Sequence, residues 1–363
     1  MLLAMTLSPR MAEAQPEESD LAHWVVAQHG HLVIDASSQI TGIILRGSWV
    51  TDTDLDRLSH LSNLRSLDLS LTNITDRGME RLRSLSSVLD LNLYYAELVT
   101  DAGVAHLKGW KQLEHLNLRG TKVNDSGLEH LRNLTGLRSL DVSFSEVTDN
   151  GLQHLAGLGE LEELSIGGNK MSVAGLYALR LLPRLKRLNL SGSQRTDSGL
   201  WSVAVNDLNL DSIAALLPLE ALNLGGAKIS DLGLAKLKSL KLLRSLGLNE
   251  TQVSSKGLRV LGRLQKIERL SLWKCQGVDD GAASFLAAAT NLTTLDLSET
   301  KFSDKGLELL PTMTRLKKLY LEGTSVTGGS VEAFRQRNPQ CQVSWGDGGF
   351  QKESKRPVDE EER

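Results

Sequence analysis

Residues 64–79 read LRSLDLSLTNITDRGM, and this stretch decides the fold. Its first half has the pattern L-x-x-L-x-L, and a short polar turn separates it from a second half of the form (I/V)-(T/S)-D-x-G-L. The unit recurs along most of the 363-residue chain. Its aspartate falls at Asp52, Asp76, Asp101, Asp125, Asp149, Asp197, Asp231, Asp280 and Asp304, and three further copies have Val173, Ser255 and Gly328 instead.

Successive copies of this position are 24 or 25 residues apart, except for a 34-residue interval between Asp197 and Asp231. A fixed period of this length indicates a solenoid, in which each unit buries its apolar face against its neighbours. Leu67 and Leu69 alternate with polar residues, which predicts a short strand with its leucines pointing inward. Asp76 suits the start of the helix that should follow. We therefore predict an α/β leucine-rich-repeat solenoid of about 12 repeats. It should be curved, with parallel strands on the concave face and helices on the convex face.

The two ends of the chain depart from the repeat. Residues 20–45 are predicted to form an N-terminal cap of one amphipathic helix and strands, because an open solenoid end would leave leucines wet and strand edges unpaired. Residues 329–345 are predicted to form a C-terminal cap in which Trp345 covers the end of the leucine core. The repeat domain with its caps therefore spans residues 20–345, and the charged residues 346–363 are predicted to be a disordered tail.

Residues 1–19 are predicted to be a leader, either disordered or signal-like. Met1 to Leu7 is a short apolar run, and Ala12-Glu13-Ala14 has the small-x-small shape of a signal-peptide cleavage site. No basic residue precedes the run, however, and its length is at the lower limit for an export signal. A cytoplasmic location and export to the periplasm or cell envelope therefore both stay open.

Composition and motifs argue against several functions. The net charge of −3 gives no basic field, so nucleic acid is not an expected partner. No run of about 18 apolar residues is present, so no membrane span is predicted. The chain has no G-x-S-x-G, G-x-x-x-x-G-K-(S/T), H-E-x-x-H or paired C-x-x-C motif, so we predict no enzyme, no catalytic residue and no cofactor.

Two further features receive structural interpretations. His106, His130 and His154 recur every 24 residues on the predicted outer helices. Helix axes usually lie about 8–10 Å apart, whereas zinc holds its nitrogen ligands at about 2.1 Å, so no metal site is predicted. Cys275 belongs to a column of small polar residues that follows each strand, so we interpret it as a buried spacer whose side chain bonds turning backbone.

The unit resembles known repeats. Leu-x-Leu-Ser-x-Thr-x-(Ile/Val)-Thr-Asp-x-Gly-Leu is similar to the leucine-rich repeats of planctomycete and related bacterial proteins, and residues 337–345 resemble the end cap of that group. Cys275 to Gly281 is also similar to the C-x-x-I-T-D-x-G-L repeat of eukaryotic F-box/leucine-rich-repeat proteins. The resemblance covers about residues 20–345. It implies an interaction platform, and it does not identify the partner.

Two groups of side chains on the concave face are candidate partner-binding sites. In the first, Tyr94 and Arg119 share a column on neighbouring strands, and Tyr95 and Phe144 flank Gly120 in the next column. The second contains Trp273 and Lys274 between two glutamates, and Tyr320 lies two strands further on. Tyr, Trp and Arg dominate binding hot spots. The alternative is cross-strand pairing that only stabilises the sheet. Both groups fall in 25-residue repeats, where we expect the added residue to push side chains outward.

The 34-residue interval is interpreted as about ten extra residues within 201–217. They are expected to lengthen a helix or bulge from the convex side, either as tolerated decoration or as a binding element.

We therefore predict a non-catalytic bacterial scaffold that binds another macromolecule, a protein, on its concave face. Two alternatives remain: a substrate-recognition adaptor or secreted effector of the F-box/leucine-rich-repeat type, and a glycan-binding envelope protein. The oligomeric state is not predicted.

Overall fold

The computed structural model describes residues 16–346 and forms two compact units, which meet in the sequence between Leu164 and Ser165. We call them unit one and unit two. Residues 1–15 of the predicted leader and 347–363 of the predicted tail lie outside the described residues. Helix α1 begins at Pro16, four residues before the cap boundary expected from the sequence.

Unit one repeats strand and helix. Its elements are α1 (Pro16–Ala27), β1 (His31–Ile34), β2 (Ile40–Ile44), the 3-10 helix η2 (Asp52–Leu58), β3 (Ser66–Asp68), α2 (Asp76–Arg81), β4 (Asp90–Asn92), α3 (Asp101–Val104), η3 (Ala105–Gly109), β5 (His115–Asn117), α4 (Asp125–Leu131), β6 (Ser139–Asp141), α5 (Asp149–Gln153) and η4 (His154–Gly157). Strand β7 (Glu163–Ser165) follows. Strand β1 pairs antiparallel with β2, and β2 to β6 pair parallel in chain order.

Unit two continues the same alternation. Its elements are α6 (Val173–Ala178), η5 (Leu179–Leu181), β8 (Arg187–Asn189), β9 (Ser193–Thr196), β10 (Gly199–Ser202), α7 (Leu210–Ala214), β11 (Ala221–Asn223), α8 (Asp231–Leu234), η6 (Ala235–Ser239), β12 (Ser245–Gly247), η7 (Gly257–Arg263), β13 (Arg269–Ser271), η8 (Asp280–Ala282), α9 (Ala283–Ala288), β14 (Thr294–Asp296), α10 (Asp304–Leu309), β15 (Lys318–Glu322), α11 (Gly328–Arg337) and β16 (Gln342–Gly346). Strands β8 and β11 to β16 pair parallel in that order.

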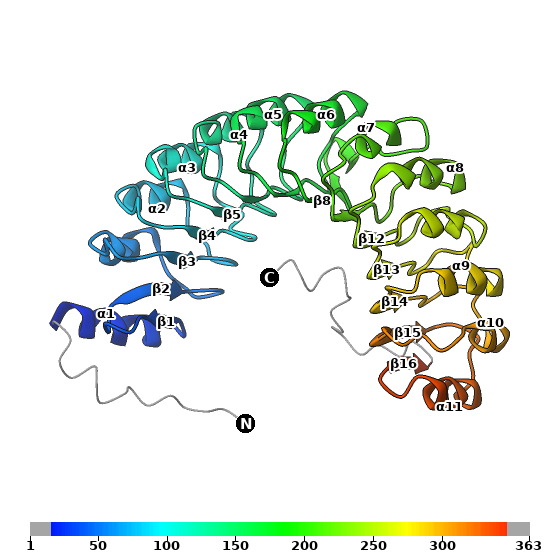
Figure 1. Ribbon diagram of the computed structural model, residues 1–363. Helices are drawn as coiled ribbons and strands as arrows, with labels where there is room; N and C mark the ends of the chain where they lie inside the picture. The colour runs from blue at the N-terminus through cyan, green and yellow to red at the C-terminus, as the bar shows by residue number, and fades with distance from the viewer. Residues whose placement is uncertain (1–15, 347–363) are drawn as a thin grey trace. The chain divides into compact units, whose positions relative to one another are not determined.

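Within each unit the strands run along one side and the helices along the other (Figure 1). The strand leucines lie opposite one another, as Leu67, Leu91 and Leu116 do, and all three are at most 2% exposed. This continuous leucine core is what stacking identical units should produce. The predicted leucine-rich-repeat solenoid is confirmed. The surface beside the strand leucines, facing away from the helices, is here called the strand face.

The repeated aspartate joins each repeat to the next. Asp76 Oδ1 accepts from the backbone N–H groups of Thr100 (2.8 Å) and Gly103 (2.9 Å), and Asp76 Oδ2 accepts from Thr100 Oγ1 (2.7 Å). Thr100 also caps its own helix. One carboxylate therefore satisfies donors at the next helix start that would otherwise be unpaired. The same bond recurs from Asp52, Asp125, Asp231 and Asp304.

The three copies without aspartate have separate explanations. At Ser255 the roles are exchanged: Ser255 Oγ donates to Asp279 Oδ1 at 2.6 Å and accepts from the Asp279 N–H at 2.8 Å. At Gly328 a Cβ would lie 2.8 Å from the Trp345 ring, so glycine makes room for the indole. Val173 makes no such bond. The Asn206 N–H, at the next cap position, instead donates to Asn209 Oδ1 of its own repeat at 2.8 Å.

The extra residues lie elsewhere than the sequence interpretation placed them. Asp197 does not begin a helix, because residues 193–202 form an antiparallel hairpin of β9 and β10. Asp207 takes the aspartate role instead: its Oδ1 accepts from the Ser230 N–H at 2.8 Å and its Oδ2 accepts from Ser230 Oγ at 2.5 Å. The insertion is therefore this hairpin after β8, and the interpretation that placed it in 201–217 was wrong.

The caps follow the repeat with small differences. At the C-terminal end Val343 is buried, whereas Trp345 is 41% exposed and packs over Gly328. Trp345 thus covers the start of α11, and it does not plug the leucine core as expected. Within residues 16–346, no helix is both long and apolar enough to cross a membrane.

Candidate functional site

The position two residues after each strand's last leucine has a left-handed backbone. We call this series the turn column. It contains glycine at Gly47, Gly120, Gly168, Gly192, Gly226 and Gly323, and side-chain-bearing residues at Leu71, Tyr95, Phe144, Glu250, Lys274 and Glu299, all with φ between 51° and 99°. The conformation is imposed by the sheet, because the N–H of Tyr95 donates to the Arg119 carbonyl at 2.7 Å and that of Lys274 donates to the Ser298 carbonyl at 3.0 Å.

A side chain in this conformation is strained. An L-residue there costs about 1–2 kcal/mol because its Cβ crowds the following carbonyl, whereas glycine has no such penalty. Such strain persists only where the surroundings impose it, and it gathers at functional sites. Three of the residues predicted to bind a partner, Tyr95, Phe144 and Lys274, hold strained positions in the turn column.

In unit one the predicted residues come together with one addition. The Tyr94 and Tyr95 rings lie edge to face with centroids 4.7 Å apart. The Arg119 guanidinium lies 4.6 Å from the centre of the Phe144 ring, and the Arg46 guanidinium lies 5.9 Å from that of Tyr94. We call Arg46, Tyr94, Tyr95, Arg119 and Phe144 the aromatic cluster. Sequence reasoning missed Arg46, although it lies in the same column as Tyr94 and Arg119.

Glycine at position 120 is required by the aromatic cluster. A Cβ on Gly120 would lie 2.8 Å from the Tyr95 ring, which covers this backbone. The added residue of the 25-residue repeat lies after the two tyrosines, at Glu97–Leu98, so Tyr94 and Tyr95 keep the regular register. The expectation that the added residue pushes them outward was wrong.

Three large apolar side chains are exposed in turns that follow strands of unit one. Trp49 is 84% exposed, and Leu71 and Leu98 are nearly half exposed, on three successive repeats. A contiguous exposed apolar patch marks an interaction site, whereas single exposed apolar residues are common on protein surfaces. The sequence signal was an apolar residue in turns that otherwise carry polar ones.

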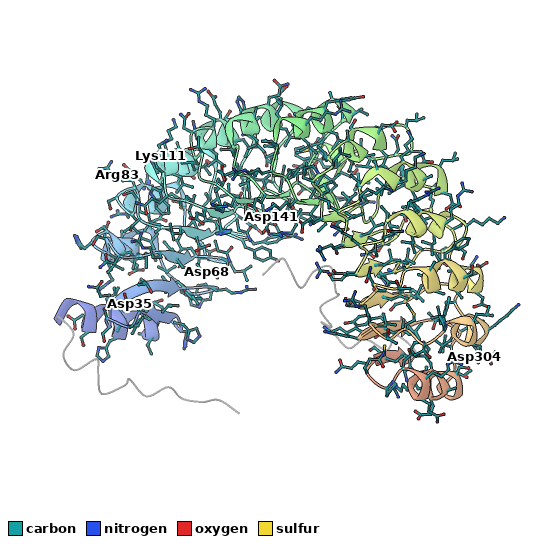
Figure 2. All side chains as sticks on the ribbon, viewed as in Figure 1. Asp35, Asp68, Arg83, Lys111, Asp141 and Asp304 are labelled. Carbon is teal, nitrogen blue, oxygen red and sulfur yellow. The ribbon has the colours of Figure 1, made fainter. Side chains whose placement is uncertain are left out.

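The charged groups beside the aromatic cluster are mostly structural. Asp141 Oδ1 accepts from the Ser143 N–H at 2.7 Å, and Asp68 Oδ1 accepts from the Ser70 N–H at 2.8 Å. Burial raises the pKa of Asp141, while the Ser143 hydrogen bonds and the Arg119 charge oppose that rise. In unit one, Asp68 and Asp141 lie among the strands, whereas Arg83 and Lys111 lie on the helix side (Figure 2).

In unit two the predicted residues form a charged group around one indole. Lys274 Nζ lies 4.0 Å from the centre of the Trp273 ring, 3.9 Å from Glu250 Oε1 and 3.8 Å from Glu299 Oε2. Trp273 Nε1 donates to Glu299 Oε1 at 2.8 Å. We call Glu250, Trp273, Lys274 and Glu299 the tryptophan cluster. Two carboxylates hold the Lys274 ammonium over the Trp273 ring. This arrangement stabilises the fold more than an isolated surface ion pair does.

Two neighbours complete the description of the tryptophan cluster. Asn249 precedes the strained Glu250, and its Oδ1 is buried without a hydrogen-bond partner among the described residues. A buried acceptor left unpaired is unfavourable by about 1–3 kcal/mol, which a donor from a ligand would offset. Tyr320 lies in the column of Ser271 and Asp296, one column away from Trp273, so the structure does not bring it into this cluster.

The residues given structural roles behave as spacers. Cys275 is buried, its Sγ donates to the Leu248 carbonyl at 2.9 Å, and burial raises its pKa. Burial lowers the pKa of His130, because it disfavours the charged imidazolium, and the nearby Lys108 charge lowers it further. The described part of the chain holds no group of three or more His, Cys, Asp or Glu side chains that would suit a metal ion.

The match to a repeat family and the superposition on one solved structure agree with this fold. Five segments, residues 60–82, 112–131, 133–156, 216–238 and 288–310, match the Leucine Rich repeat family. Among curated proteins, none matches this chain in sequence. An internalin from Listeria monocytogenes superposes with a TM-score of 0.55 at 19% identity, over 97% of this chain and 100% of the internalin. A leucine-rich-repeat protein of Leptospira interrogans gives 0.49 at 16% identity, over 80% of each chain.

Proposed function

We propose that this leucine-rich-repeat protein binds another protein through its strand face, with the aromatic and tryptophan clusters as contact points. Leucine-rich-repeat domains generally mediate protein–protein interaction. The observation that carries the proposal is the turn column, in which strained residues at Tyr95, Phe144 and Lys274 occupy positions where other repeats have glycine. A solely structural column would favour glycine throughout, because glycine satisfies the same backbone hydrogen bonds without strain.

The chemistry of the clusters fits a protein surface. Tyr, Trp and Arg provide large contact areas with little loss of side-chain entropy, and they dominate interface hot spots. Arg46 and Arg119 already stack on aromatic rings, so their orientation is fixed before a partner arrives. The aromatic cluster offers apolar area with two cations, and the tryptophan cluster offers two carboxylates around one cation.

The test starts from a partner captured from native lysate and then measures its affinity for variants by calorimetry. Tyr94→Ala and Trp273→Ala are each expected to weaken binding by at least about tenfold, or ~1.4 kcal/mol. Tyr177→Ala is the matched control, because Tyr177 is an exposed aromatic on helix α6. Unchanged affinity in both strand-face variants, with an intact partner complex, would remove the site assignment.

The same experiment separates the proposal from its alternatives. Recovery of ligase subunits with the captured chain would favour a substrate-recognition adaptor or effector. Binding on a glycan array that Trp273→Ala abolishes would favour a glycan-binding envelope protein, since aromatic rings also stack on sugars. A protein partner whose affinity depends on either cluster, with no glycan binding, would support the proposed scaffold role.

A further inference from the structure

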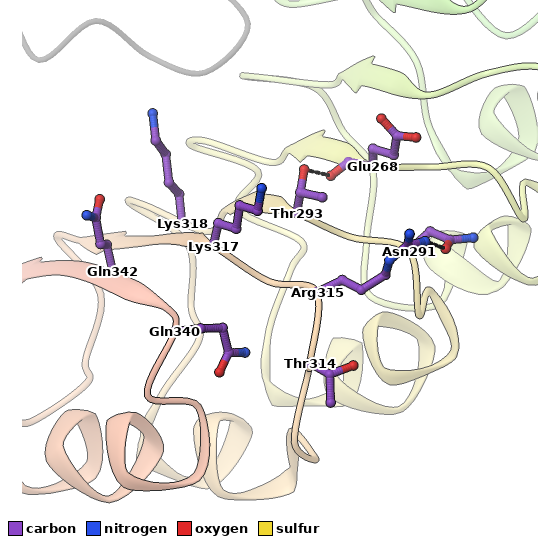
Figure 3. A pocket seen from close by; sticks show the side chains of 9 residues that line it. All are labelled: Glu268, Asn291, Thr293, Thr314, Arg315, Lys317, Lys318, Gln340 and Gln342. Carbon is purple, nitrogen blue, oxygen red and sulfur yellow. Dashed lines mark hydrogen bonds between the residues drawn. The ribbon is translucent and has the colours of Figure 1, made fainter.

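A groove lined by polar and charged residues lies in unit two, at the amino-terminal ends of β13 to β16 (Figure 3). Its volume is about 890 Å³. Three cations within four residues line it: Arg315, Lys317 and Lys318. Its one carboxylate, Glu268, already accepts a hydrogen bond from Arg244. The groove therefore carries a net positive charge.

Three of the five neutral residues that line the groove donate side-chain hydrogen bonds to backbone carbonyls. Thr293 Oγ1 donates to the Glu268 carbonyl at 3.0 Å, Asn291 Nδ2 donates to the Gln265 carbonyl at 2.6 Å, and Gln340 Nε2 donates to the Met313 carbonyl at 2.9 Å. These bonds tie neighbouring repeats together. The charged side chains of Arg315 and Lys317 line the groove beside these hydrogen-bonded residues.

The cations are arranged for an extended ligand. Asn291 Oδ1 accepts from Arg315 and so orients the guanidinium across two repeats (Figure 3). Lys317 is exposed just before β15, and Lys318 is the first residue of that strand. Both lysines line the groove, and their side chains point in different directions (Figure 3). An arginine fork pairs well with a carboxylate.

We propose that this groove binds an acidic segment of a protein partner, with carboxylates held by Arg315, Lys317 and Lys318. No aromatic residue is among those lining the groove, so it offers no ring for stacking on a base or sugar. The groove is separate from the aromatic and tryptophan clusters, and it would add a charge-selective contact beyond them. Exposed ion pairs are weak and salt-sensitive, so the interaction should contribute selectivity and rapid association.

The test uses fluorescence anisotropy of a labelled hexaglutamate peptide with the full chain at low ionic strength. Arg315→Gln/Lys317→Gln/Lys318→Gln is expected to weaken binding by at least about fivefold. Raising the salt to about 0.15 M should weaken the wild type in the same direction. The matched control is Lys238→Gln/Lys256→Gln/Lys305→Gln, which removes three exposed cations from other parts of unit two. The control should change affinity by less than about twofold.

Several outcomes would overturn the inference. Equal losses of affinity in both triple variants would show that binding depends only on overall charge. Equal binding of hexaglutamine would exclude carboxylate recognition. A sulfated hexasaccharide that binds more tightly and depends on the same three cations would reassign the groove to glycans. Neutralising the chain's own acidic run, residues 359–362, changes the overall charge and should raise affinity by no more than about twofold, the limit set for the charge control. A larger gain would show that this run competes for the groove and would refute a partner as its occupant. Melting curves confirm that each variant is folded.

Discussion

Strain at Lys274 gives a prediction whose sign depends on the replacement residue. Lys274 has φ 57° and bonds its N–H to the next repeat, so every substitution keeps the left-handed backbone. Lys274→Ala loses the cation–π contact and two ion pairs at the distance limit, together about 1 kcal/mol. The alanine Cβ keeps the strain, so this variant should be destabilised by that amount.

Lys274→Gly loses the same contacts but also relieves the strain. Removing the Cβ gains about 1–2 kcal/mol, of which roughly 0.5–1 is offset by the greater entropy of glycine in the unfolded chain. The net change should therefore lie within about 0.5 kcal/mol of the wild type. Glycine should exceed alanine in stability by about 0.5–1 kcal/mol, the reverse of their order in a helix.

Gly226 calibrates this difference in the same unit. It has φ 77°, and a Cβ built there meets no atom within 4 Å. Gly226→Ala should therefore report backbone strain alone, a loss of about 0.5–1 kcal/mol. Urea unfolding followed by far-UV circular dichroism measures all three variants. The reasoning fails if Lys274→Gly is as unstable as Lys274→Ala, or if Gly226→Ala leaves the urea midpoint unchanged.

Three further predictions concern the links between repeats. Asp76→Ala should lower the free energy of unfolding by about 1–3 kcal/mol because it leaves part-buried donors unpaired. Asp197→Ala, in a hairpin turn, should change it by less than about 0.5 kcal/mol, and equal effects in urea unfolding would contradict the linking role of Asp76. The Thr327 N–H lowers the pKa of Asp304, so this group's stabilisation should be present above the unfolded pKa of about 3.9 and lost as pH falls through the lower folded value. Asp304→Asn should flatten the fall in stability at pH values below the unfolded pKa of about 3.9, and an unaltered profile would disprove the link. Cys275→Ser should lower the free energy of unfolding by less than about 1 kcal/mol, since Ser145 Oγ donates to the preceding repeat in the same way at 3.1 Å. Cys275→Val should lower it more, because valine cannot make this bond; equal losses of stability in thermal denaturation would contradict the spacer role.

Most of the fold was predictable because one short pattern repeats with its chemistry intact. The leucines and the capping aspartate each follow from packing and hydrogen bonding within one unit. The pattern misled at Asp197, where Thr196 to Leu200 imitates a helix start. Arg195 occupies the position that must be apolar and buried, whereas Val205 provides that residue before Asp207. Testing that one position would have located the insertion correctly.

The candidate site was only partly predictable. Parallel register was enough to bring Tyr94 near Arg119, because equivalent positions of adjacent repeats must meet. The stacking of Arg119 on Phe144 and the reach of Arg46 depend on side-chain rotamers, which the repeat pattern does not fix. The turn column gives one signal in the sequence, because half of its positions are glycine. The strain at the remaining positions becomes visible only from backbone angles.

The missing carboxylate at Val173 has a mechanical consequence. When the chain is stretched, force passes from one repeat to the next, and the hydrogen bonds of each repeated aspartate resist the separation of neighbouring repeats. Between α6 and α7 Val173 provides no such carboxylate, and the Asn206 N–H donates instead to Asn209 of its own repeat. Under a pulling force the repeats of unit two should therefore separate first between α6 and α7. Single-molecule extension would show a small early step before the repeats that are joined by aspartate unfold.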